Sequence, residues 1–227
     1  MTQPVPSPTV LAVDTAQERC AVALRVAGAT AVTRTLAEPK GHAEALLPLI
    51  GEVLAQANLQ YRDVHLLAAT TGPGVFTGVR VGLAAVRGLR LALGIPALGI
   101  GTLPATAATA RAAGVAGAIA TVNDARRDEV YLQTFTAHGE PNQEAVLIPL
   151  SEASGHLRPE MTVVGTAVPP LRGLLADTTF QYAAVERPDV GIVAAMAEAL
   201  YAAADLPQPR PLYVRPPHIT QPRGAAQ

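Results

Sequence analysis

The sequence predicts an α/β fold made of two related halves, and three observations support this. Segments at residues 10–14, 20–26 and 31–36 are apolar or alternate apolar with polar residues, and short turns join them, which is typical of an antiparallel meander. Apolar residues then recur at helical spacing, and helices alternate with buried strands. After residue 102 the same order begins again more loosely.

The first half predicts a layer of five strands and two helices. Apolar residues from Ala43 to Ala57 recur at helical spacing, and Pro48 inside this run indicates a kink or a later helix start. A wholly apolar strand at residues 64–71 leads into a glycine-rich segment at 70–94, and another strand follows at 97–100. Parallel strands joined through helices need helices to cover the sheet. This pattern is that of a ribonuclease-H-like layer, the half-unit of the actin, Hsp70 and sugar-kinase type of fold.

The second half predicts a smaller, degenerate copy of the same layer. Its elements are a helix at 105–113, strands at 118–123, 129–135, 146–148 and 161–164, a short helix at 170–175, a strand at 182–185 and a final helix at 190–204. We therefore expect an N-terminal subdomain at residues 9–104, a C-terminal subdomain at 105–206, and a proline-rich extended tail at 207–227.

Composition limits the classes of function. The 227 residues are 49% apolar and 15% charged, which indicates a globular chain. A net charge of −1 argues against broad nucleic-acid binding by this chain alone, because neutralising phosphates requires clustered Lys and Arg. The single cysteine, Cys20, cannot form an internal disulfide, and residues 1–9 lack the features of a signal peptide. A cytoplasmic protein without a membrane span is expected.

The segment at residues 70–94 organises the prediction for function. It opens with a Gly-Pro-Gly turn and continues as a helix with two apolar faces and Arg80 and Arg87 on a third. One apolar face holds Val79, Leu83, Val86 and Leu93, and the other holds Gly78, Val81, Gly82, Ala85, Gly88 and Ala92. Each glycine costs a helix interior up to about 1 kcal/mol relative to alanine, so three on one side indicate that another backbone comes close. That backbone belongs either to the same domain or to a partner protein.

Two short stretches are candidates for an anion or nucleotide contact. Asp14 and Thr15 end the first strand, where this superfamily keeps a phosphate- or metal-facing acid, but the glycine of the usual Asp-x-Gly-Thr loop is missing. A hydrogen bond from the next turn to Asp14 is therefore the favoured interpretation. The Gly72–Gly74 turn leads into a helix N-terminus, which favours anions, but it lacks the lysine of a P-loop.

Other polar residues give no self-sufficient catalytic arrangement. His42 is followed by Glu44, yet no second His or Cys stands at ligand spacing, so capping or packing is favoured over metal binding. The charged stretch at residues 126–129 is expected to be a solvated hairpin tip. The sequence holds no nucleophile elbow and no zinc-binding helix motif.

Five stretches carry a resemblance to a known family: LAVDTAQERCAVAL, GHAEALLPLIGEVLAQANL, TTGPGVFTGVRVGLAAVRGLRLALGIPALGIGTLPA, VNDARRDEVY and PLYVRPPHIT. Together they resemble the bacterial TsaB (YeaZ) family, most densely from residue 10 to 105. The resemblance implies an actin-like two-domain fold and a role in the N6-threonylcarbamoylation of adenosine 37 in tRNAs that read ANN codons. It also implies two partners, the catalytic paralogue TsaD and the small ATPase TsaE, which supply the ATP and metal chemistry.

One local comparison indicates that this chain resembles the non-catalytic subunit and not its catalytic paralogue. The catalytic paralogue carries a His-x-x-x-His metal pair, and in this sequence the matching positions are Thr102 and Thr106. Threonine does not hold iron or zinc in such sites. We therefore expect no metal site and no cofactor bound by this chain alone.

Two hypotheses follow. In the first, the chain is a scaffold that binds a TsaD-like subunit, or a second copy of itself, through its first two helices, with tRNA reached only through the complex. The expected contact residues are His42, Leu46, Leu47, Ile50, Phe76, Val81, Ala85 and Gly88. In the second, the chain is a small-molecule kinase or ATPase that uses Asp14 and the loop at residues 72–78. The expected nucleotide or anion contacts are Asp14, Thr15, Gly72, Gly74 and Arg80.

Overall fold

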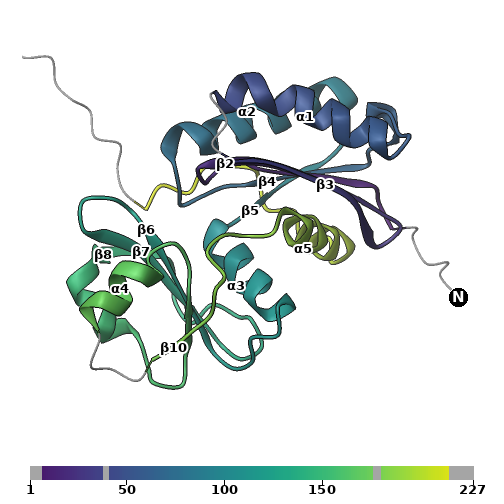
Figure 1. Ribbon diagram of the computed structural model, residues 1–227. Coiled ribbons are helices and arrows are strands. Elements are labelled where there is room, and N and C mark those ends of the chain that lie inside the picture. The colour runs from purple at the N-terminus through teal and green to yellow at the C-terminus, as the bar shows by residue number, and fades with distance from the viewer. Residues whose placement is uncertain (1–6, 38–40, 176–179, 215–227) are drawn as a thin grey trace, which may run out of the picture.

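Two five-stranded sheets with the same strand order form the protein. The structure is a computed structural model that describes residues 7–37, 41–175 and 180–214. The first sheet has the order β3-β2-β1-β4-β5 and the second β8-β7-β6-β9-β10 (Figure 1). In both sheets three antiparallel strands are continued by two parallel ones, which confirms the predicted pair of ribonuclease-H-like layers.

The first sheet is built from buried strands, because helices cover both of its faces. Every residue of β1 (Val10–Asp14) and β4 (Leu66–Thr70) is buried, as expected for central strands covered on two sides. β1 pairs antiparallel with β2 (Arg19–Val26) and parallel with β4. The edge strands are β3 (Ala29–Ala37) and β5 (Ala97–Ile100).

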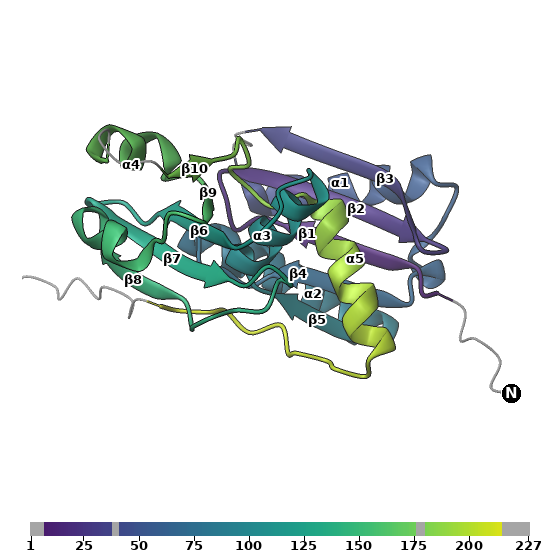
Figure 2. The same cartoon turned by 90° about the horizontal axis from the view of Figure 1, so that it is seen from below.

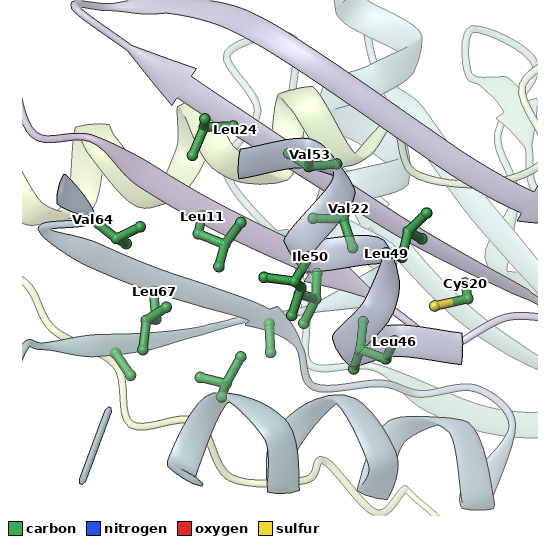
Figure 3. Packing of buried hydrophobic residues seen from close by; sticks show 14 of the residues in the cluster. Leu11, Cys20, Val22, Leu24, Leu46, Leu49, Ile50, Val53, Val64 and Leu67 are labelled. Carbon is green, nitrogen blue, oxygen red and sulfur yellow. The ribbon is translucent and has the colours of Figure 1, made fainter. Parts of the chain in front are cut away.

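Helices α1 (His42–Gln56) and α2 (Phe76–Leu93) lie together on one face of the first sheet. In Figure 3 the α1 side chains Leu46, Leu49 and Ile50 lie over the sheet residues of the same core cluster. α1 contains Pro48 but begins six residues before it, so the predicted later start does not occur. α2 ends at Gly94, whose φ of 68° is the left-handed conformation of a helix C-cap.

The second sheet is shorter and carries smaller outer helices. Its strands are β6 (Ile119–Asp124), β7 (Glu129–Phe135), β8 (Val146–Pro149), β9 (Thr162–Val164) and β10 (Gln181–Tyr182). A 3₁₀ helix, η2 (Leu150–His156), and α4 (Val168–Leu174) cover its outer face. β10 is only two residues long, so the predicted strand at residues 182–185 is largely absent.

Two helices lie between the sheets, and each packs mainly on a different sheet. α5 (Val190–Ala202) lies on the inner face of the first sheet, where Val193, Ala194 and Ala197 join its core (Figure 2). α3 (Thr102–Ala112) begins three residues earlier than predicted and packs on the second sheet through Leu103, Ala107 and Ala110. Residues 105–206 therefore include α5, which packs on the first sheet. A single cut in the sequence does not separate the two layers in space.

The predicted tail begins as an extended segment on the surface. Residues 207–214 run beside β5, and residues 215–227, including His218 and the end of the PLYVRPPHIT stretch, lie outside the described residues. Within the described part of the chain, no helix is both long and apolar enough to cross a membrane.

Candidate protein-binding surface

Two of the three glycines in α2 face the protein's own β1–β2 turn. A Cβ added at Gly78 would lie 1.9 Å from the Thr15 carbonyl oxygen, and one at Gly82 would lie 2.4 Å from Thr15 Oγ1. Gly74, in the preceding turn, has the Ala16 carbonyl oxygen 2.0 Å from its ideal Cβ. At Gly88 no atom of the chain lies within 4 Å of the ideal Cβ, so the predicted close approach there would have to come from a partner.

The outer face of α2 has no neighbour within the described chain. Val81 and Ala85 are half-buried at its edge, whereas Ala84, Gly88 and Leu91 are exposed, with Leu91 at 87%. These residues are small or apolar and recur at helical spacing. α2 packs beside α1, so the exposed faces of the two helices lie on the same side of the first sheet (Figure 1).

The predicted contact residues on α1 divide into a buried and an exposed group. Leu46 and Ile50 are 1% and 0% exposed and belong to the core beneath the helix, so their prediction as surface contacts is wrong (Figure 3). Leu47 is 50% exposed and is available to a partner. His42 is the first residue of α1, half-buried, and its Nε2 has no hydrogen-bond partner.

The extended segment at residues 207–214, which we call the strap, binds along β5 and α2. Gly99 N donates to the Pro207 carbonyl at 2.9 Å, and Leu212 N donates to the Thr71 carbonyl at 2.8 Å. The Arg87 guanidinium donates twice to the Pro209 carbonyl, at 2.7 and 3.1 Å. A third arginine of α2, Arg90, donates to the Gln208 side chain at 3.3 Å. The strap thus runs along the arginine side of α2, and all three arginines stay exposed to solvent.

The end of the strap forms a stacked cluster with the first turn of α2. The Arg80 guanidinium lies 3.7 Å from the centroid of the Phe76 ring and 5.9 Å from that of Tyr213. The two rings are 5.7 Å apart, and Arg80 Nε donates to Tyr213 Oη at 3.1 Å. Phe76 and Tyr213 are each 43% exposed, so the cluster is open to solvent.

Exposed large apolar side chains gather on this side of the molecule. Six of the nine in the described residues belong to α1, α2, the residue preceding α2 or the strap: Leu47, Val75, Phe76, Leu91, Leu212 and Tyr213. Exposed apolar side chains that gather on one surface often mark a protein–protein interaction site, whereas single scattered ones do not. We call these residues, with Ala84, Ala85 and Gly88, the outer surface.

Asp14 is buried and its carboxylate is used within the chain. Oδ1 accepts hydrogen bonds from Ala16 N at 3.1 Å and from Thr70 Oγ1 at 2.7 Å. Oδ2 lies 3.6 Å from Arg19 Nη2 in an ion pair. Burial and the nearby Asp14 carboxylate together raise the pKa of the Cys20 thiol to about 11. The favoured interpretation, in which Asp14 binds the following turn, is confirmed.

The turn at residues 72–78 packs on main chain where a phosphate cradle would need free N–H groups. Val75 N donates to the Ala16 carbonyl at 2.7 Å, and carbonyl oxygens of Thr15 and Ala16 face Gly78 and Gly74. Carbonyl oxygens repel anions. Arg80 makes its described contacts with Phe76 and Tyr213, so the structure does not bring it to Asp14.

A cleft of 220 Å³ separates the two sheets at the β1–β2 turn. Its lining includes Gln17, Asn123, Tyr131 and Arg187, and burial raises the pKa of Tyr131. The side chain of Glu18 forms an ion pair across the cleft with Arg126 at the tip of the β6–β7 hairpin. The predicted solvated tip therefore also joins the two halves.

The residues at the expected metal positions do not suit a metal. Thr106 Oγ1 donates to the Thr102 carbonyl at 2.9 Å, and both side chains are fully buried in α3. Across residues 7–37, 41–175 and 180–214, no three His, Cys, Asp or Glu side chains are grouped so that they could hold a metal ion.

Comparison with known proteins places this architecture in a family. Residues 35–165 match the family model described as TsaD, tRNA N6-adenosine threonylcarbamoyltransferase. The protein of Escherichia coli strain K12 named tRNA threonylcarbamoyladenosine biosynthesis protein TsaB is 36% identical over 165 residues, which cover 69% of this chain and 71% of the relative. The chain belongs to the TsaB family. A TsaB of Haemophilus influenzae is 40% identical over 123 residues, 54% of this chain and 52% of the relative.

The solved structures agree with the TsaB assignment. A structure described as YeaZ from Pseudomonas aeruginosa superposes with a TM-score of 0.81 at 27% identity. The superposition covers 91% of this chain and 99% of the YeaZ chain. The two proteins therefore share this two-layer arrangement over nearly their full lengths.

Proposed function

We propose that this TsaB-family chain takes part in tRNA threonylcarbamoyladenosine biosynthesis as a non-catalytic scaffold subunit. The reaction is the N6-threonylcarbamoylation of adenosine 37 in tRNAs that read ANN codons, and the proposed role is to bind and activate a TsaD-like catalytic subunit. The observation that carries the proposal is the outer surface, where large apolar side chains of α1, α2 and the strap are exposed to solvent. Two relatives are named tRNA threonylcarbamoyladenosine biosynthesis protein TsaB, and these names support the proposed pathway.

Two features support a subunit that does not perform the chemistry itself. Thr102 and Thr106 occupy the positions of the catalytic paralogue's metal pair, and their hydroxyls lack the donor strength of imidazole. Asp14, the acid that would face a phosphate or metal, is fully buried, and its Oδ1 accepts hydrogen bonds from Ala16 N and Thr70. Its Oδ2 makes no hydrogen bond among the described residues and lies 3.6 Å from Arg19 Nη2. These residues stabilise the fold instead.

The proposal assigns the remaining components to the partners. The TsaD-like subunit supplies the metal and the transfer reaction, a TsaE-like ATPase uses ATP, and tRNA reaches this chain through the complex. In the absence of the paralogue, the same outer surface serves a homodimer. Residues 35–165, which contain α1 and α2, match the family model of the transferase. This chain and a TsaD-like protein therefore have the same helix pair, which supports a partner of the same fold.

Substitution of one exposed glycine by arginine tests the proposal. Gly88→Arg places a long cation on the centre of the outer surface, where no atom of the chain lies within 4 Å of the ideal Cβ. Gly173→Arg is the matched control, because Gly173 is equally open on α4 of the other half. We expect Gly88→Arg to abolish co-purification with the TsaD-like protein, and Gly173→Arg to leave it unchanged.

Ala85→Arg is expected to act in the same way. Because Ala85 is half-buried, the circular dichroism spectrum of this variant must first show that its fold is intact. Normal co-purification of a folded Gly88→Arg protein would contradict the proposal. Calorimetry of the isolated chain with Mg-ATP tests the competing kinase or ATPase hypothesis, which requires binding that Asp14→Ala removes. We expect no such binding without the partner subunits.

A further inference from the structure

We infer that the strap completes the partner-binding surface and that Tyr213 is a specificity-determining anchor for the catalytic paralogue. This inference rests on the proposed function and adds to it a segment more than a hundred residues away from α2 in the sequence. Tyr213 stands beside Phe76 and Arg80, at the end of α2 where the outer surface begins.

The anchor is fixed before any partner arrives. Main-chain hydrogen bonds hold the strap at Gly99 and Thr71, and the Arg87 guanidinium clamps the Pro209 carbonyl between them. Alternate prolines at positions 207, 209 and 211 further restrict its backbone. A partner that binds Tyr213 therefore does not have to order the strap, which lowers the entropic cost of association.

The chemistry of the cluster is that of a binding hot spot. Tyr and Arg are enriched among residues whose truncation weakens protein complexes most, and both rings here are nearly half exposed. Arg80 is held against the two rings by stacking and by its bond to Tyr213 Oη. Covering this cluster would bury two aromatic rings, and the remaining N–H donors of Arg80 would need acceptors on the partner.

Charge favours the paralogue over a second copy of this chain as the occupant. α2 and the strap carry Arg80, Arg87, Arg90 and Arg210, and residues 76–93 and 207–214 contain no Asp or Glu. A symmetric dimer about this cluster would bring like charges together, which costs binding energy. A paralogue with the same helix pair can instead place acidic residues opposite these arginines.

The test measures the affinity of the full-length chain for the separately purified TsaD-like protein. We expect Tyr213→Ala to raise the dissociation constant at least about tenfold, as for an interface hot spot. Tyr213→Phe keeps the ring and is expected to bind nearly as tightly as the wild type. Leu174→Ala, which truncates an exposed side chain on α4, is the control and is expected to bind like the wild type.

Hydrogen exchange distinguishes a direct contact between Tyr213 and the partner from a role of Tyr213 in holding the strap in place. The inference requires that Tyr213→Ala keeps the Gly99 and Leu212 amides protected while binding weakens. It is overturned if Tyr213→Ala binds like the wild type, if weaker binding appears only together with lost protection at those amides, or if the substitution weakens self-association alone. If the wild-type chain itself fails to bind the TsaD-like protein, the proposed function fails as well, which distinguishes the two failures.

Discussion

The two halves of the molecule share a strand order but differ in what covers it. The outer face of the first sheet carries α1 and α2, of 15 and 18 residues, whereas that of the second carries η2 and α4, of seven residues each. Together with the strap, the first outer layer holds six of the nine exposed large apolar side chains of the described residues. The sheet is thus the common framework, and the length and surface of the outer helices distinguish the half proposed to bind a partner.

On the inner faces of the two sheets, by contrast, the two halves depend on each other. α5 completes the core of the first sheet, and its Arg25–Glu198 ion pair, with Nε and Oε2 2.5 Å apart, ties β2 to this helix. α3 completes the core of the second sheet. We therefore expect the two layers to unfold as one cooperative unit.

The largest expected effect is the loss of folding on cutting the halves apart. A fragment of residues 1–104 lacks α5, so apolar residues such as Leu66, Leu98 and Ile100 would face water. We expect no cooperative thermal transition and little native circular dichroism from this fragment. Adding a peptide of residues 186–214, which supplies α5 and the strap, is expected to restore a transition. A fragment that unfolds cooperatively by itself would show that the halves are independent.

A pair of glycine substitutions divides α2 into its inner and outer sides. Gly78→Ala forces a methyl group against the Thr15 carbonyl, so we expect unfolding free energy to fall by about 3 kcal/mol. Gly88→Ala meets no atom and removes a flexible residue from a helix, so we expect a gain of about 0.5–1 kcal/mol. Urea denaturation measures both. Equal effects at the two sites would contradict the assignment of sides.

The smallest expected effect concerns the reactivity of thiols beneath the two outer layers. Cys20 is buried under α1 and its pKa of about 11, against the ordinary 9.0, leaves about a thousandth of it as thiolate at pH 8 (Figure 3). We expect almost no labelling by iodoacetamide in the native state. Val163→Cys in a Cys20→Ser background places a thiol under η2 and α4, and we expect faster labelling there because shorter helices open more readily.

The raised pKa also fixes the direction of a pH effect. The folded chain disfavours the Cys20 thiolate, so ionisation of the unfolded chain lowers stability as pH rises from about 9 toward 11. Cys20→Ser is expected to reduce this alkaline loss, which urea denaturation at several pH values measures.

Local pattern was sufficient to predict most elements of the fold. Strands such as residues 10–14 and the hairpin around residues 126–129 depend on nearby residues, so period and turn signals locate them. The position of α5 depends instead on contacts with β1 and β2, some 170 residues earlier, to which its own sequence gives no guide.

The candidate site was predicted less well for the same reason. Leu46, Leu47 and Ile50 are all apolar in one helix, and only the angle of α1 on the sheet decides that Leu47 alone is exposed. The inward use of Gly78 depends on the distant turn at Thr15. Tyr213 could have been suspected, because an aromatic residue among alternating prolines is unusual for a solvated tail.

The alternating prolines of the strap also determine how the first sheet ends. β5 is an edge strand, and an uncovered edge offers unpaired N–H and C=O groups to strands of other molecules. The strap occupies this edge through Pro207 and Leu212, while Pro207, Pro209 and Pro211 have no N–H to donate outward. Edge-to-edge association at β5 is thereby discouraged, whereas the helix surface that we propose for partner binding stays open.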